Sequence, residues 1–297
     1  MALEFLVQLL VNGFVIGLLY GVVAMSFVLI YKSSMVVNFA QGEFLLVGAW
    51  ACWWLLSQFS LPFYAAFIMT LIFMTIFGII IQIVVLRPLI GEPIISIIMV
   101  TIGLSIFFQA IMKWMFGVFA EPFPEIFTSK SISILGLNIQ TVYIMSGLIS
   151  IFIMISFAIF FKKSRLGLAM RATAFDQQAA QSLGVSVKEV FSAAWGISAL
   201  VSAVAGVVFG IVNGVSSGIS IIGIKVFPAV ILGGLDSILG AVLGGMVIGI
   251  LENIAQYFDV QYLKIGNLYN IAPFYALIII LMIKPYGFFG TKDIERV

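Results

Sequence analysis

Three polar side chains capable of binding a ligand stand close together in this 297-residue chain. Asn38, Gln41 and Glu43 lie in the run Asn-Phe-Ala-Gln-Gly-Glu, at the mouth of an apolar segment. Polar groups in such a place are costly unless they are paired or hydrated. One interpretation is a helix end that lines a translocation route, with two amides offering hydrogen bonds and Glu43 a partner charge. The alternative is that these groups join neighbouring helices or cap a helix at the cytoplasmic interface.

A second group of candidates lies in the glycine-rich stretch 228–245. Gly233 and Gly234 are expected to break a helix, because glycine is a poor helix former. Asp236 is then placed to cap the next helix through the backbone amides freed at its start, with a role on a translocation route as the second possibility. Further along, Glu252 either pairs with a charge or reaches the membrane interface, so it is a weaker candidate.

A third group lies in the polar stretch 162–189. Its alanines and glutamines favour a short surface helix that ends at Gly184, and Ser186 with Glu189 forms a capping-box pattern for the next helix. Small side chains here leave room for another protein to approach closely, which suggests a docking element. The alternative is a plain solvated helix. The candidate docking residues are Asp176, Gln178, Ala179, Ala180 and Gly184.

Several kinds of chemistry are disfavoured by what the sequence lacks. There is no histidine, which is the commonest general base and metal ligand, and Cys52 is the only cysteine. No G-x-x-x-x-G-K-[ST] motif is present to bind a nucleoside triphosphate. We therefore expect no catalytic residues, no metal site and no cofactor in this chain, and any ATP must be handled by a partner. A membrane-embedded enzyme has little support.

The elements that position these candidates are membrane helices. Hydrophobic residues make up 63% of the chain and charged residues 9%, so a bilayer is the solvent that fits. The net charge of +2 gives no reason to expect a nucleic-acid partner. We predict an all-α polytopic membrane bundle of about eight to ten helical segments, several of them broken or re-entrant, forming one transmembrane domain over 1–297.

Five charge-free stretches are long enough to cross a hydrocarbon core of roughly 30 Å as helices. They are 6–30, 61–86, 94–112, 142–161 and 190–212. Two other regions, 34–57 and 221–254, are interrupted by polar residues, glycine or proline and are expected to be irregular. A shorter apolar run covers 268–283.

The distribution of basic residues predicts the orientation. If 162–189 is cytoplasmic, that side carries ten lysines and arginines against four on the other side. The positive-inside rule then places the N-terminus outside and the C-terminus in the cytoplasm. The basic residues outside the loop that support this assignment are Lys32, Arg87, Lys284, Lys292 and Arg296; those on the opposite side are Lys113, Lys130, Lys225 and Lys264.

Glycines recur every four residues in two of the expected spans. Such stripes let helix backbones approach closely in a lipid environment, where the hydrophobic effect contributes little between helices. We expect them to pack helices together, with conformational hinges as the alternative. The glycines concerned are Gly13, Gly17, Gly21, Gly206 and Gly210.

The three polar groups together resemble the LivH-like permease subunits of branched-chain amino acid and amide ABC transporters. The run 38–43 is similar to the family's N-F-A-x-G-E segment, 229–241 to its late glycine-rich segment, and 171–184 to its cytoplasmic loop. In that loop, Gln178-Ala179-Ala180 followed by Gly184 resembles the E-A-A-x-x-x-G coupling motif of ABC importers. Gln178 replaces the motif's carboxylate, and Gln41 replaces a histidine found in many family members.

The resemblance implies a permease subunit in a bacterial inner membrane that takes up branched-chain or other hydrophobic amino acids. Its implied partners are a second, LivM-like permease, two cytoplasmic ATP-binding subunits, an extracytoplasmic substrate-binding protein and membrane lipid. Residues 38–43 and 233–236 would border the route, and 176–184 would couple to the ATPases. The alternatives are an amide or urea permease of the same family, or an ion-coupled secondary transporter that uses Glu43 and Glu252.

Overall fold

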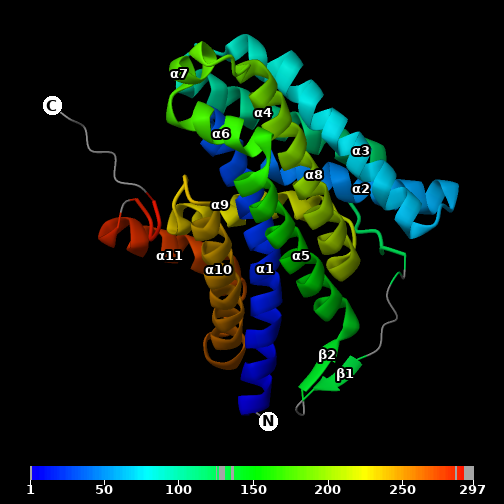
Figure 1. The fold of residues 1–297 in the computed structure, drawn as a ribbon. Helices are drawn as coiled ribbons and strands as arrows, with labels where there is room; N and C mark the ends of the chain where they lie inside the picture. The colour runs from blue at the N-terminus through cyan, green and yellow to red at the C-terminus, as the bar shows by residue number, and fades with distance from the viewer. Residues whose placement is uncertain (1, 125, 127–130, 135–136, 285, 291–297) are drawn as a thin grey trace. The chain divides into compact units, whose positions relative to one another are not determined.

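A computed structural model describes residues 2–124, 126, 131–134, 137–284 and 286–290 of the chain (Figure 1). Over these residues the protein is almost entirely helical, with eleven α-helices, so the predicted all-α class is confirmed. This number is slightly higher than the predicted eight to ten helical segments, because the loop 162–189 contains two helices where one was predicted. Lys130, Lys292 and Arg296, used to predict the orientation, lie outside the described residues.

The elements follow one another along the chain with few long connections. The helices are α1 (Ala2–Ser34), α2 (Gln41–Phe59), α3 (Phe63–Ile81), α4 (Ile94–Phe116), α5 (Thr141–Lys163), α6 (Arg165–Phe175), α7 (Gln177–Ser182), α8 (Val187–Asn213), α9 (Ile221–Gly233), α10 (Ile238–Phe258) and α11 (Leu268–Ile283). Short π or 3-10 turns are η1 (Gln82–Leu86), η2 (Arg87–Leu89), η3 (Ser217–Ser220) and η4 (Asp259–Leu263). Strands β1 (Ser131–Ile134) and β2 (Leu137–Gln140) form an antiparallel hairpin in which Ser131 pairs with Gln140.

Six helical segments of the described chain are long and apolar enough to cross a membrane. Five of them coincide with the five predicted charge-free stretches, although the second begins at Phe63 and not at Leu61, and the sixth is 238–263. The chain is therefore a multi-pass membrane protein. The two regions predicted to be irregular are interrupted as expected, because α2 begins only at Gln41 and a turn at 234–237 separates α9 from α10.

The chain divides into two compact units. Unit 1 comprises Met1–Val28, Phe127–Ile151 and Lys225–Val297, and unit 2 comprises Leu29–Ile126 and Phe152–Ile224. Helices α1, α5 and α9 each contribute residues to both units. The two predicted groups of pathway residues fall in different units, 38–43 in unit 2 and 233–236 in unit 1.

In unit 2, helix α8 packs along α2 and α3 (Figure 1). The rings of Phe44 and Trp195 meet edge to face at 5.9 Å between centroids. The backbones also approach closely, since a Cβ atom on Gly206 would collide with the backbone of Leu45, and one on Gly48 with Ala203. Gly210 lies beside the side chains of Phe123 and Val215. Small residues therefore set the spacing of this seam, as lipid-embedded helices require.

In unit 1, the glycines of α1 pack against glycines of α10. A Cβ atom on Gly17 would collide with the backbone of Met246, and one on Gly249 with Gly17 itself. Gly21 lies against Gly245 in the same way, and a Cβ on Gly13 would lie 3.0 Å from the carbonyl oxygen of Gly249. The stripe on α1 thus faces a matching stripe on α10.

The loop 162–189 contains two helices where one was predicted. Asp176 separates them because its Oδ1 atom accepts hydrogen bonds from the amides of Gln178 at 2.8 Å and Ala179 at 3.0 Å, which starts α7. Gly184, with φ of +85°, follows the end of α7 as predicted. Ser186 caps α8, accepting from the amide of Glu189 at 3.4 Å.

The break between α9 and α10 corrects the predicted cap. Gly234 has φ of +104°, a conformation that favours glycine. Ser237, not Asp236, is the N-cap of α10, and its hydroxyl accepts a hydrogen bond from the amide of Gly240 at 3.1 Å. Ser237 takes this role because it is the residue directly before the helix, three positions from the amide that it caps.

Candidate functional site

The start of α2 is fixed by the side chains of Asn38 and Gln41. Asn38 accepts a hydrogen bond from the amide of Ala40 at 3.0 Å, which forms the turn before the helix. Its side-chain nitrogen donates to Oε1 of Gln41 at 3.0 Å. Both side chains are buried. The two predicted amides are therefore brought together.

Gln41 also joins α2 to α8. Its side-chain nitrogen donates to the hydroxyls of Ser202 at 2.5 Å and Ser198 at 3.2 Å, one helical turn apart on α8. All three side chains are buried. We call Asn38, Gln41, Ser198 and Ser202 the amide seam. Every group in it is neutral, so it buries polarity without burying charge.

Glu43 lies on the first turn of α2 and is also buried. Its carboxylate takes a hydrogen bond from the hydroxyl of Ser105, a residue of α4. The backbone at Gly42 also lies close to the end of η3, because a Cβ atom on Gly42 would collide with the carbonyl group of Ser220. The beginning of α2 is thus held by both side-chain and backbone contacts.

The second predicted group lies at the end of α9 in unit 1. Gly233 packs against Gly240 of α10 so closely that neither position has room for a Cβ atom. The carbonyl oxygens of Leu232 and Gly233 accept hydrogen bonds from the amides of Phe288 at 2.8 Å and Phe289 at 3.2 Å. The end of α9 is therefore tied to the segment that follows α11.

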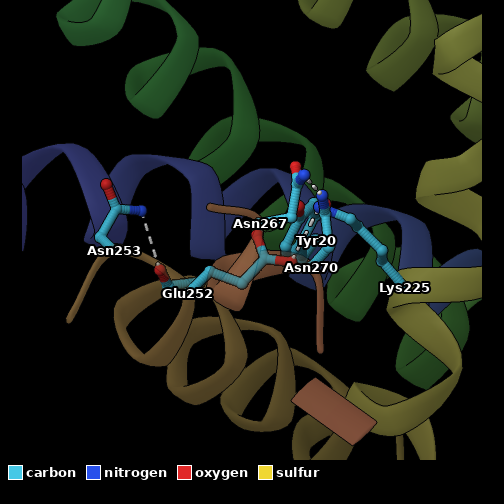
Figure 2. Close-up of polar contacts among 7 residues, drawn as sticks. Tyr20, Lys225, Glu252, Asn253, Asn267 and Asn270 are labelled. Carbon is cyan, nitrogen blue, oxygen red and sulfur yellow. Dashed lines mark hydrogen bonds and ion pairs between the residues drawn. The ribbon is translucent and has the colours of Figure 1, made fainter. Parts of the chain in front are cut away.

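An ion pair inside unit 1 is the strongest polar feature that sequence reasoning passed over (Figure 2). The ammonium of Lys225 on α9 lies 3.2 Å from Oε1 of Glu252 on α10. The hydroxyl of Tyr20 on α1 donates to Oε2 of the same carboxylate at 2.7 Å. The sequence predicted Glu252 as a weak candidate that either pairs with a charge or reaches the interface, but it did not identify Lys225 as the partner. The position of Lys225 within an apolar stretch could have indicated a buried ion pair or a functional site.

The ion pair is bordered by the turn between α10 and α11. Lys225 lies over the ring of Tyr269 at 5.0 Å from its centroid. Asn270, in the first turn of α11, donates to Asn267 at 3.2 Å (Figure 2). We call Tyr20, Lys225, Glu252 and Tyr269 the charged cluster. It draws one residue from each of α1, α9, α10 and α11.

The turn itself is held by Asp259. Its Oδ1 atom accepts from the amides of Ile265 at 2.9 Å and Gly266 at 3.0 Å, and Oδ2 accepts from Leu268 at 3.1 Å. A carboxylate that receives three backbone hydrogen bonds fixes both the turn and the first residue of α11. Sequence reasoning did not identify this role.

The candidate docking residues are divided by burial. Asp176, Gln178, Ala179 and Gly184 are exposed, whereas Ala180 is buried. Two large apolar side chains flank α7 in the open, Phe175 at 95% and Leu183 at 83% exposure. A cavity of about 190 Å³ has Gln177 of α7 and Trp195 of α8 in its lining. The structure thus presents α7 on the surface of unit 2.

Helix α6 is anchored to the end of α5 by Arg171. Its guanidinium donates to the carbonyl oxygen of Phe161 and lies over the Phe161 ring at 5.5 Å from the centroid. The same ring faces the ammonium of Lys32 at 5.9 Å. The last carbonyl groups of a helix have no partner within it, so a basic side chain there is stabilising.

Over the described residues, no cluster of three or more cysteine or carboxylate side chains lies in a position to bind a metal ion.

Sequence comparisons identify relatives of this chain. The family model described as "Branched-chain amino acid transport system / permease component" matches residues 9–283. The high-affinity branched-chain amino acid transport permease BraD of Pseudomonas aeruginosa is 30% identical, over 98% of this chain and 97% of its own length. LivH of Salmonella typhimurium is 28% identical over 99% and 98% of the two chains.

The fold is also found in a solved structure. PsaBC from Streptococcus pneumoniae, in complex with Fab, aligns with a TM-score of 0.55 over 95% of this chain and 92% of that chain. The sequence identity is 19%, so this likeness concerns the fold alone.

Proposed function

This chain belongs to the permease-component family of branched-chain amino acid transport systems, and from this membership we propose that it carries branched-chain amino acids. It is a membrane-spanning permease subunit of an ABC transport system. The observation that carries the proposal is a family match over nearly the whole described chain. The relatives whose names give this substrate also align over almost their full lengths.

We place the translocation route beside two helix ends. In unit 2 it would be bordered by the start of α2, at Asn38, Gln41 and Glu43. In unit 1 it would be bordered by the end of α9, at Gly233, Gly234 and Asp236. Both places support the proposal because helices are interrupted there, and interrupted helices commonly form the binding sites of transporters. The amide seam would act by positioning the start of α2.

Energy would reach the permease through α7. Asp176, Gln178, Ala179 and Gly184 would dock on a cytoplasmic ATP-binding subunit, and the small exposed surface of α7 supports this. Ala180, the fifth proposed coupling residue, is buried and would act through the packing of α7. The complete importer would hold a LivM-like second permease, two ATP-binding subunits and an extracytoplasmic binding protein. The chain itself would need no cofactor, and ATP would be used by its partners.

The proposed orientation has the N-terminus outside and the C-terminus in the cytoplasm of a bacterial inner membrane. The excess of basic residues on the side of 162–189 supports it. A cysteine introduced at exposed Gln178 should react with an impermeant thiol reagent only after inside-out vesicles are prepared. Labelling in intact spheroplasts would reverse the orientation.

Reconstitution tests the transport function. The permease would be co-expressed with its neighbouring subunits, placed in liposomes with ATP inside, and supplied with binding protein and radiolabelled leucine. We expect uptake that requires ATP, the ATPases and the binding protein together. Uptake driven by a proton gradient without ATP would identify a secondary transporter instead. Uptake of urea or an amide in preference to leucine would assign the chain to the other subtype of its family.

A further inference from the structure

The charged cluster of unit 1 is expensive for a protein to keep in a membrane. Removing two ions from water costs several kcal/mol for each ion, and apolar replacements of a buried pair are often neutral or stabilising. Glu252 is buried, and only 13% of the Lys225 side chain is exposed, on helices in which apolar residues predominate. Packing alone therefore gives little reason for the pair. Ionisable groups inside membrane helices usually mark a route for a solute.

The shape of the cluster suits a ligand that carries both charges. One oxygen of Glu252 meets the Tyr20 hydroxyl and the other meets the Lys225 ammonium. A positive and a negative group thus stand 3.2 Å apart on two different helices. The ammonium and carboxylate of a free amino acid are attached to a single carbon atom, so an opened pair presents complementary charges to both.

The turn beside the cluster has the features of a site that moves. Helix α10 ends in the π-helical turn η4, an irregularity often found at functional sites. Lys264 and Asn267 in the same turn have positive φ values of 52° and 67°, which cost free energy in residues other than glycine. Tyr269 lies two residues after Asn267, and the Lys225 ammonium lies over its ring. The strained segment and this ring are therefore adjacent.

We propose that Lys225 and Glu252 are counter-charges for a zwitterionic amino acid during transport, Lys225 for its carboxylate and Glu252 for its ammonium. The inference rests on the proposed function and names the residues that would contact its cargo. The pair opens, each partner exchanges its neighbour for the opposite charge of the ligand, and Tyr20 stays bonded to Glu252. Because the pair and the ligand are both neutral overall, no net charge is buried at any step.

The test separates a contact with substrate from a structural bond. Glu252→Gln and Lys225→Met each leave one buried charge without its partner, so either variant is also at risk of failing to assemble. The double variant Lys225→Met/Glu252→Leu removes both charges and avoids that risk. We expect it to insert and to co-purify with the ATPases as wild type does. Its ATP-driven leucine uptake in liposomes should fall on the order of 100-fold.

The charge exchange Lys225→Glu/Glu252→Lys restores an ion pair with its ends reversed. We expect assembly close to wild type and uptake still reduced at least tenfold, because each ligand charge now meets its like. The control is Lys113→Met, which removes an exposed lysine of α4 that donates to Gln109 in unit 2. Its uptake should stay within about twofold of wild type, since exposed charges contribute little.

The possible outcomes are distinct. If wild type does not transport leucine with ATP and binding protein, the proposed function fails. If wild type transports leucine and the apolar double variant does so at a similar rate, the pair is structural and this inference is overturned. The inference is also overturned if the double variant fails to assemble while the charge-exchange variant assembles and transports normally. The ion pair would then serve only to hold the helices together.

Discussion

The two units bury polar groups against glycine-packed helices in different ways. In unit 2 the amide seam joins α2 to α8 through neutral amides and hydroxyls, beside Gly206. In unit 1 the charged cluster joins α9 to α10 and α1 through an ion pair, beside Gly249. Neutral hydrogen bonds are enough to hold helices together. The charges of unit 1 therefore exceed what packing needs, and this difference points to a role in transport.

The largest effect should come from filling the glycine seams, which the two units share. Gly206→Val and Gly249→Val each place side-chain atoms where the backbone of a neighbouring helix lies. We expect losses of about 3 kcal/mol or more, because backbone cannot move aside as a side chain can. Thermal unfolding of the purified protein in detergent, with the yield of assembled complex, measures this.

A valine on an open helix face is the control for this pair of variants. A Cβ atom on Gly103 of α4 would meet nothing within 4 Å. Gly103→Val should change stability by less than about 1 kcal/mol, the scale of helix propensity. If Gly249→Val changed stability as little as this control, close glycine packing would not stabilise unit 1 as it is expected to stabilise unit 2.

The next largest effect concerns docking. Ala179 is exposed on α7, so Ala179→Trp should leave the fold intact while a bulky ring prevents close approach of an ATPase. We expect transport and ATPase co-purification to be lost together, with unchanged thermal stability. The apolar double variant of the charged cluster should do the opposite, keeping the ATPases and losing transport. Helix α7 would then serve energy coupling, and the charged cluster would serve contact with the cargo.

Ala120→Trp is the matched control, because Ala120 is also exposed but lies outside 162–189. Its ATPase co-purification should equal that of wild type. If Ala179→Trp still co-purified normally with the ATPases, α7 would not be part of the docking surface. Ala180 does not suit this test, since it is buried and a bulky residue there would disturb packing.

Much of the fold follows from short-range patterns in the sequence. The apolar stretches 61–86 and 94–112 predicted helices that the structure contains, because in lipid a spanning backbone must satisfy its own hydrogen bonds. The sequence also predicted that the helix would be interrupted at Gly233 and Gly234. The cap of α10 was misassigned to Asp236 because Asp236 and Ser237 are adjacent and both are good caps.

The polar partners could not be predicted because they are distant in sequence. Gln41 and Ser198 are separated by 157 positions, and Tyr20 and Glu252 by 232. No local pattern encodes which helices become neighbours. Asp259 was missed for a related reason, since its role depends on the course of the turn as far as Leu268. Whether residues 38–43 and 233–236 border the route stays a prediction.

A smaller effect should distinguish the amide seam from the charged cluster. Gln41→Leu leaves Ser198 and Ser202 without the amide that they share, and should cost about 1–3 kcal/mol in thermal stability. Because the amide seam is proposed to act by positioning the start of α2, transport per assembled complex should fall much less than in the variants of the charged cluster. The triple variant Gln41→Leu/Ser198→Ala/Ser202→Ala removes both sides and should regain part of the loss. Transport that vanished while stability held would place the Gln41 amide directly on the route.

The smallest effect concerns the residue after α7. Gly184 has φ of +85° and open space around it, so Gly184→Ala meets no neighbouring atom and is disfavoured only by the backbone. The expected cost is about 1 kcal/mol, measured as a small fall in melting temperature with ATPase binding retained. Gly184→Asn should cost less, because asparagine tolerates this conformation better than alanine does. A strong transport defect in Gly184→Ala with unchanged stability would show instead that the partner ATPase contacts this position, and would extend the docking surface of unit 2 beyond Ala179.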